Sequence, residues 1–98
     1  MISMKIHERE GELLVAACDS DILGKTFRGG GFRIEVSESF YHGEEGDEEM
    51  LVARLRMATI VNLVGKMTVD IAIKHGFVDG ACVLMIDGVP HAQIARMM

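Results

Sequence analysis

The chain has 98 residues, of which 49% are hydrophobic and 26% are charged, and its formal net charge is −5. A chain of this length buries roughly two-thirds of its unfolded surface around one core, so we predict a single domain over residues 1–98. No apolar stretch approaches the roughly 18 residues of a membrane-spanning helix, which argues against a membrane protein. The first residues, MISMKIHERE, lack the apolar segment of a secretory signal. We therefore expect a cytoplasmic protein.

The charge is unevenly divided along the chain. Residues 1–49 carry a net charge of −7 and residues 50–98 a net charge of +2. Non-specific nucleic-acid binding depends on cationic side chains that neutralise phosphates, so this balance argues against a general nucleic-acid-binding protein. A local basic patch stays compatible with it.

The N-terminal third predicts two β-hairpins. Apolar and polar residues alternate over 4–6 and 13–17 around a polar turn at 9–11, which is typical of paired strands. A short helical turn should follow, begun by Asp19 and ended by Gly24 in the left-handed conformation. Strands over Thr26–Arg28 and Phe32–Val36 then flank three glycines. These glycines do not have the spacing of a phosphate-binding P-loop.

The second half predicts two helices and further short segments. Acidic residues over 43–49 favour a helix that begins near Asp47. Helical spacing of apolar residues predicts a second helix, which begins at Thr59 or Asn62 and ends at Gly76. The apolar run Cys82–Ile86 indicates an interior strand, and Pro90 is placed to open a brief terminal helical turn. The fold class is therefore α+β, with a small, mostly antiparallel sheet packed against two helices.

The two cysteines, Cys18 and Cys82, both lie in apolar runs, and no CxxC spacing is present. We expect both to be small core residues, with a disulfide between them as the less favoured alternative. No HxH or HExxH spacing exists, and the acidic run lacks the ligand pattern of an EF-hand, so we predict no metal site. No cofactor motif is present, and we expect no cofactor.

Several polar and aromatic residues are candidates for a site. His91 lies between Pro90 and Gln93, where a rigid turn would present an imidazole near an amide; it is either a ligand or acid–base residue or a structural hydrogen-bond partner. Asn62 interrupts an apolar run, so it must cap a helix or make a specific hydrogen bond. Phe40 and Tyr41 offer either a stacking surface or two core anchors. His75 is expected only to complement the dipole of a helix C-terminus.

Four segments carry a resemblance to a known family: LGKTF at 23–27, VSESFYHG at 36–43, ATIVNLVG at 58–65 and DGVPHAQ at 87–93. Together and in this order they resemble the archaeal domain-of-unknown-function family 424, and the similarity covers nearly the whole chain. It implies an archaeal, cytosolic, stand-alone protein and brings no established catalytic residue, substrate or cofactor. The shared segments correspond here to the site candidates Phe40, Tyr41, Gly43, Asn62, Gly65, Pro90, His91 and Gln93.

We expect a small binding module in which these residues recognise a protein or RNA element. One alternative is a small enzyme that uses His91 as general acid or base, with Asn62 or Gln93 orienting the substrate. The other is a structural homo-oligomer, in which the apolar strand at 82–86 and the Met97–Met98 tail pack against another copy. The sequence identifies neither the partner nor a catalytic residue.

Overall fold

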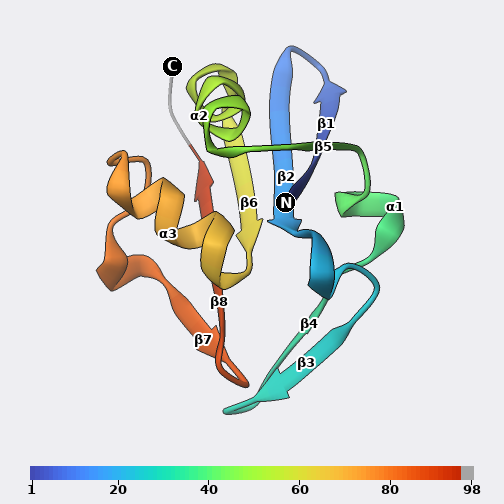
Figure 1. The fold of residues 1–98 in the computed structure, drawn as a ribbon, viewed down its shortest axis with the longest axis vertical. Coiled ribbons are helices and arrows are strands. Elements are labelled where there is room, and N and C mark those ends of the chain that lie inside the picture. The colour runs from blue at the N-terminus through green and yellow to red at the C-terminus, as the bar shows by residue number, and fades with distance from the viewer. Residues whose placement is uncertain (96–98) are drawn as a thin grey trace.

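A mixed six-stranded sheet forms the centre of the computed structural model, which describes residues 1–95 (Figure 1). The strands are β1 (Ile2–Arg9), β2 (Glu12–Asp19), β3 (Thr26–Gly29), β4 (Phe32–Glu35), β5 (Glu44–Gly46), β6 (Ile60–Val64), β7 (Leu84–Ile86) and β8 (Val89–Ala95). The helices are α1 (Glu38–Tyr41), α2 (Glu48–Met57) and α3 (Lys66–Lys74), with single 3-10 turns at Ser20–Ile22 and Gly80–Cys82. The sheet order is β5-β1-β2-β6-β8-β7, while β3 and β4 pair separately. Among the strands of the described residues, only β2 and β6 pair in parallel.

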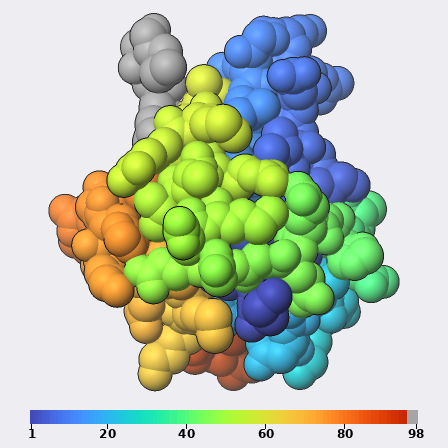
Figure 2. All heavy atoms as spheres, turned by 45° about the horizontal axis from the view of Figure 1, so that its top comes forward, coloured from blue at the N-terminus to red at the C-terminus, as the bar shows by residue number. Residues whose placement is uncertain are grey.

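One face of the sheet, called the helix face, is covered by α2 and α3. Side chains alternate between faces along a strand, so the register places Met4, Ala17, Leu63 and Ala92 in one row across four strands. All four are buried in the larger hydrophobic core. The helices add apolar side chains to the same core: Leu51, Val52, Leu55, Val69, Ile71 and Ala72. In Figure 2, α2 and the segment before it form the middle of the visible surface and hide the strands beneath.

The other face, called the second face, is covered only in part. Ala16, Cys18 and Val64 form a smaller core there with Val36 and Tyr41. The cover comes from α1, the 3-10 turn at Ser20–Ile22 and the β3–β4 hairpin, whose partly buried apolar residues pack against this core. In Figure 1 this hairpin lies at the bottom of the molecule, away from α2. No helix within residues 1–95 is long and apolar enough to cross a membrane.

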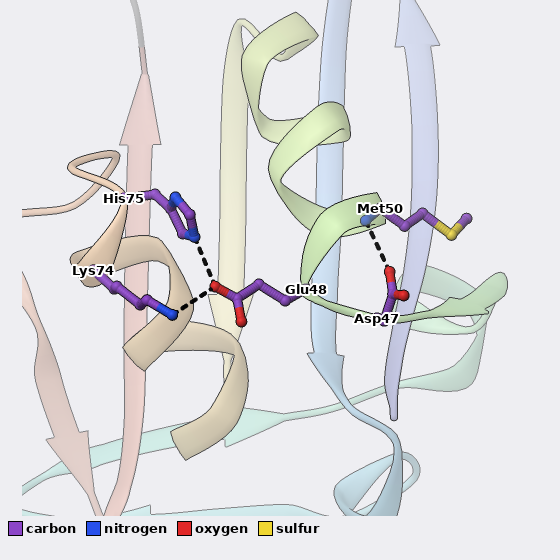
Figure 3. A network of polar contacts seen from close by, with 5 residues as sticks. All are labelled: Asp47, Glu48, Met50, Lys74 and His75. Carbon is purple, nitrogen blue, oxygen red and sulfur yellow. Dashed lines mark hydrogen bonds and ion pairs between the residues drawn. The ribbon is translucent and has the colours of Figure 1, made fainter.

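The structure confirms the α+β class, both predicted hairpins and the start of α2. Asp47 is the N-cap of α2, and its Oδ1 accepts a hydrogen bond from the Met50 amide at 3.0 Å (Figure 3). Gly24 follows the first 3-10 turn with a positive φ of 87°, in the left-handed region predicted for it. Local signals of capping and turn chemistry therefore located these elements correctly.

A polar contact joins the two helices on the helix face. Glu48 at the start of α2 accepts from Lys74 Nζ at 3.0 Å and from His75 Nε2 at 2.7 Å (Figure 3). These hydrogen bonds, first that of His75 and then that of Lys74, lower the pKa of the Glu48 carboxyl group. His75 is the C-cap of α3, as predicted for a residue that complements the helix dipole.

The predicted start of the second helix was wrong. Residues 60–64 form β6, a strand between β2 and β8, and α3 begins only at Lys66. Both faces of β6 are covered, which gives an almost continuous apolar run whose periodicity does not distinguish a strand from a helix. Thr59 and Asn62 therefore cap no helix. Thr59 Oγ1 instead accepts from the Leu13 amide and donates to the Leu13 carbonyl, both in β2.

The C-terminal predictions also need correction. Pro90 opens no helical turn but lies in β8, which is joined to β7 by a two-residue turn at Asp87 and Gly88. Both turn residues have positive φ, 52° and 75°, as a type I′ hairpin turn requires. The apolar run at 82–86 forms not an interior strand but the edge strand β7, preceded by a 3-10 turn. The Met97–Met98 tail lies outside the described residues.

The two cysteines differ in their surroundings. Cys18 is buried in β2, as predicted, whereas Cys82 is exposed at the end of a 3-10 turn, so its predicted place in the core was wrong. Both thiols are free. Burial, with the nearby charges of Asp19 and Asp21, raises the pKa of Cys18 to about 12. The Cys18 thiol is therefore protonated and unreactive at neutral pH.

Candidate recognition site

Three predicted site residues meet on the second face. The Tyr41 hydroxyl donates to Asn62 Oδ1 at 2.8 Å, and His91 Nε2 lies 3.1 Å from the same oxygen. Tyr41 is buried, while Asn62 and His91 are half-buried. We call these three residues the polar cluster.

The sheet register explains why the members of the polar cluster meet. Asn62 lies opposite Gln93, and Val64 lies opposite His91, so Asn62 and His91 are diagonal neighbours on adjacent strands of the same face. Gln93 is exposed beside them. Tyr41 comes from α1, far from both in sequence, and reaches the sheet over Ala16 and the buried Cys18.

Hydrogen bonds from β1 hold α1 in place. Ser3 Oγ donates to the Tyr41 carbonyl at 2.9 Å, Lys5 Nζ to the Ser39 carbonyl at 2.8 Å, and His7 Nε2 to the Phe40 carbonyl at 2.9 Å. Residues 3, 5 and 7 share one face of the strand because side chains alternate. They therefore satisfy three carbonyls at the C-terminal end of a helix of only four residues.

The polar cluster is electrically neutral. Burial raises the pKa of the Tyr41 hydroxyl, which keeps its proton for the bond to Asn62. Burial lowers the pKa of His91, which favours the uncharged imidazole. A carbonyl oxygen only accepts, so the contact with Asn62 assigns the ring proton to Nε2 and leaves Nδ1 as an acceptor.

Several polar groups in and beside the polar cluster have no hydrogen-bond partner within the described residues. Among residues 1–95, neither His91 Nδ1 nor the Asn62 side-chain NH₂ has a protein partner, and the Gln93 amide makes no side-chain hydrogen bond. The Asn62 side chain can therefore donate, His91 can accept, and Gln93 can do both. This mixture suits an uncharged polar group such as a peptide amide.

A cavity adjoins the polar cluster on the same face. It encloses about 360 Å³, and its lining residues are His7, Arg9, Glu12, Leu14, Phe40 and Ile60. Ile60 is two residues from Asn62 in β6 and shares its face of the sheet. The rings of Phe40 and His7 are stacked, with centroids 4.8 Å apart and an interplanar angle of 21°. Neither Asn62 nor His91 lines this cavity.

The remaining candidates, Gly43, Gly65 and Pro90, have roles in the backbone conformation and packing of the fold. A Cβ on Gly43 would overlap the Met4 carbonyl oxygen, so this glycine allows the chain to pass close to β1. Gly65 has a φ of 112° and donates its amide to the Pro90 carbonyl at 2.9 Å. Pro90 is buried on the helix face, opposite to the face that carries His91. The structure therefore brings together Tyr41, Asn62 and His91, places Phe40 and Gln93 beside them, and separates the other three.

Two residues that support the site and the fold, His7 and Asp19, were not identified from the sequence. His7 supports Phe40 and lines the cavity; its alternation with Ser3 and Lys5 along β1 was the available signal. Asp19 does not cap the first 3-10 turn with its side chain but accepts from the Met67 and Thr68 amides and from Thr68 Oγ1 at the start of α3. A contact over nearly fifty residues left no local signal.

Within residues 1–95, no group of three or more potential metal ligands is assembled.

Comparison with known proteins identifies the family. A family profile described as "Protein of unknown function (DUF424)" matches residues 7–97. The chain belongs to the DUF424 family. A crystal structure described as an uncharacterized conserved protein from Methanopyrus kandleri is similar to this DUF424 protein, with a TM-score of 0.82 and 22% identity. The match covers 99% of this chain and 94% of the other, and at this identity it supports the fold alone. A comparison with curated proteins gave no match.

Proposed function

We propose that this DUF424 protein is a small binding module that recognises a partner through the polar cluster, with Gln93 and the adjoining cavity. The observation that carries the proposal is the double contact at Asn62 Oδ1. Tyr41 and His91 both use this oxygen, which fixes the amide in one orientation and directs its NH₂ group away from them. Fixing a polar group before binding reduces the entropy lost on association.

The chemistry favours a protein partner over RNA. The groups offered by Asn62, His91 and Gln93 are neutral, and the chain carries a net charge of −5. RNA binding usually relies on cationic side chains around phosphates and on several aromatic platforms. An extended peptide instead presents amides that match the polar cluster and side chains that fit a cavity of about 360 Å³. A peptide segment with an apolar side chain is therefore the proposed ligand.

One observation supports a small enzyme as a second candidate. His91 is held neutral, with Nδ1 as a free acceptor, which is the state that a general base requires. Within residues 1–95 no carboxylate orients the ring, since its partner is the Asn62 amide. The binding proposal needs only the hydrogen-bonding groups already in place, and we therefore favour it.

Affinity purification from native cells tests the proposal. Three tagged versions would be compared: the natural chain, the double variant His91→Gln with Gln93→Ala, and the control Glu49→Gln, which changes an exposed residue of α2. Each would be purified with and without nuclease. We expect an identified protein to be recovered with the natural chain and the control, despite nuclease, and lost with the double variant. Equal recovery with all three would overturn this placement of the site, and loss on nuclease treatment would indicate RNA.

A further inference from the structure

The edge strand β7 has the composition of a buried strand. The run from Ala81 to Ile86 is entirely apolar, yet β7 is the last strand of the sheet order. Leu84 is 37% exposed on one face and Met85 is 57% exposed on the other. Edge strands are usually protected from pairing by charged residues, proline or a bulge. None of these features occurs within Leu84–Ile86, and the β3–β4 hairpin approaches this strand at its C-terminal end, where Gly29 lies close to the Asp87 amide.

The backbone of Met85 faces outward from this edge. In a hairpin with a two-residue turn, the residues that flank the turn bond each other, so Ile86 and Val89 form a hydrogen-bonded pair. The next pair, Met85 and Pro90, is then not hydrogen-bonded. The Pro90 carbonyl confirms this assignment, because it accepts from Gly65 on the opposite side of β8. The N–H and C=O of Met85 therefore point away from β8, where no strand of residues 1–95 pairs with them.

On the helix face, a partly apolar groove lies beside β7. It encloses about 390 Å³ between α3 and β7, and Met85 and Ile73 form exposed parts of its wall. Lys66 and Asp70 lie one turn apart on α3 and line the same groove. Neither side chain forms an ion pair within the described part of the chain. Two opposite charges on one surface are complementary to the same surface after a two-fold rotation.

We infer that β7 is a dimerisation edge, which pairs antiparallel with β7 of a second copy about a two-fold axis at Met85. Each Met85 N–H donates to the Met85 carbonyl of the other copy, so one residue supplies both central hydrogen bonds. Leu84 lies opposite Ile86 of the other copy, and the two sheets join into one. Lys66 of each copy faces Asp70 of the other across the paired grooves. The partner is a second copy because backbone and charge are both self-complementary at this edge.

Analytical ultracentrifugation of the full chain tests the inference. We expect the natural chain to sediment at twice its mass of 10.8 kDa when its concentration is about 100 μM. At this concentration a dimer with a micromolar dissociation constant is largely formed. The variant Met85→Pro removes the outward N–H together with the exposed Met85 side chain and leaves the hydrogen bonds between β7 and β8 in place, so we expect its dimer dissociation constant to rise about tenfold or more. The control Met57→Lys changes an equally exposed methionine of α2 and should sediment as the natural chain does.

A charge exchange separates loss of pairing from loss of folding. The variant Lys66→Asp places two acidic groups opposite each other and should weaken the dimer, whereas Lys66→Asp combined with Asp70→Lys should restore it. Circular dichroism of each variant would confirm that the fold is retained. A natural chain that sediments as a monomer at about 100 μM would overturn the inference, as would a folded Met85→Pro variant that dimerises as well as the natural chain.

Discussion

The Tyr41 hydroxyl donates to Asn62 Oδ1 at 2.8 Å and thereby ties the short helix α1 to the central strand β6. The two residues are separated by twenty-one positions and belong to different layers of the fold. Because His91 shares the same acceptor, the Tyr41–Asn62 hydrogen bond also fixes the orientation in which the site presents its free groups.

Removing the hydroxyl tests this link. We expect Tyr41→Phe to lower the free energy of unfolding by about 0.5–1.5 kcal/mol, the usual net contribution of one hydrogen bond, because the ring packing is retained. Urea unfolding would measure the change. Ser39→Ala alters an exposed neighbour in α1 and serves as the control. A midpoint for Tyr41→Phe equal to that of the natural chain would mean that the bond contributes nothing to stability.

Asp19 should be among the polar residues that most stabilise α3. Its carboxylate accepts from two amides in the first turn and from Thr68 Oγ1 at 2.7 Å. We expect Asp19→Ala to destabilise the protein by about 1–2 kcal/mol, as the loss of an N-cap does. The control Asp21→Ala removes an exposed carboxylate from the 3-10 turn two residues later. Equal urea midpoints for the two variants would contradict the capping role.

Alanine variants of Gly65 and Gly24 distinguish the effect of backbone strain from the effect of steric overlap. Both have positive φ, but a Cβ at Gly65 would meet the Asp19 carboxylate, whereas one at Gly24 meets nothing within 4 Å. Alanine at either position is strained by about 1 kcal/mol. We expect Gly65→Ala to be more destabilising than Gly24→Ala, because it also displaces the cap. Thermal unfolding of both variants would show whether the difference has this sign.

The two thiols should differ sharply in reactivity. Cys82 is exposed, whereas Cys18 is buried with its pKa raised to about 12. With a thiol-specific reagent near neutral pH, we expect one fast reaction in the folded protein and two after denaturation. In Cys82→Ser the fast reaction should disappear. A fast second thiol in the folded natural chain would show that Cys18 is accessible.

His91 should give stability a dependence on pH. Burial lowers its folded pKa below the ordinary value of 6.5, so the unfolded chain takes up the proton more readily. The stability contributed by neutral His91 is therefore present above pH 6.5 and is lost as the pH falls through that value. We expect His91→Gln to lose less stability than the natural chain between about pH 7.5 and about pH 5.5 in urea titrations. The control Ser39→Ala changes an exposed residue that does not titrate and should retain the natural slope.

Local chemistry predicted much of the fold. The alternation in β1 and β2, the glycine turn before β4 and the cap at Asp47 are signals confined to a few residues. β6 was predicted as helix because burial on both faces removes the alternation that identifies a strand. The edge position of β7 was missed because its composition is that of an interior strand, which the proposed dimer would explain.

The candidate site was predictable as residue types but not as geometry. The unusual amide of Asn62 in an apolar run pointed to a specific hydrogen bond, one of the two roles considered for it. Its partners, Tyr41 and His91, lie twenty-one and twenty-nine positions away. The register of β6 and β8 brings His91 to Asn62, and the packing of α1 on the second face brings Tyr41 to it. His7 and Asp19 act over still longer separations and have no local motif.

The central claim is that the polar cluster and Gln93 recognise a peptide partner. Its most direct test is isothermal titration calorimetry of the partner identified by affinity purification, using the natural chain, Gln93→Ala, His91→Gln and the control Glu49→Gln. We predict that each site variant binds about tenfold more weakly, the loss expected for one hydrogen bond at a desolvated interface, while the control binds as the natural chain does. Equal dissociation constants for all four proteins would contradict the claim and move the binding surface elsewhere.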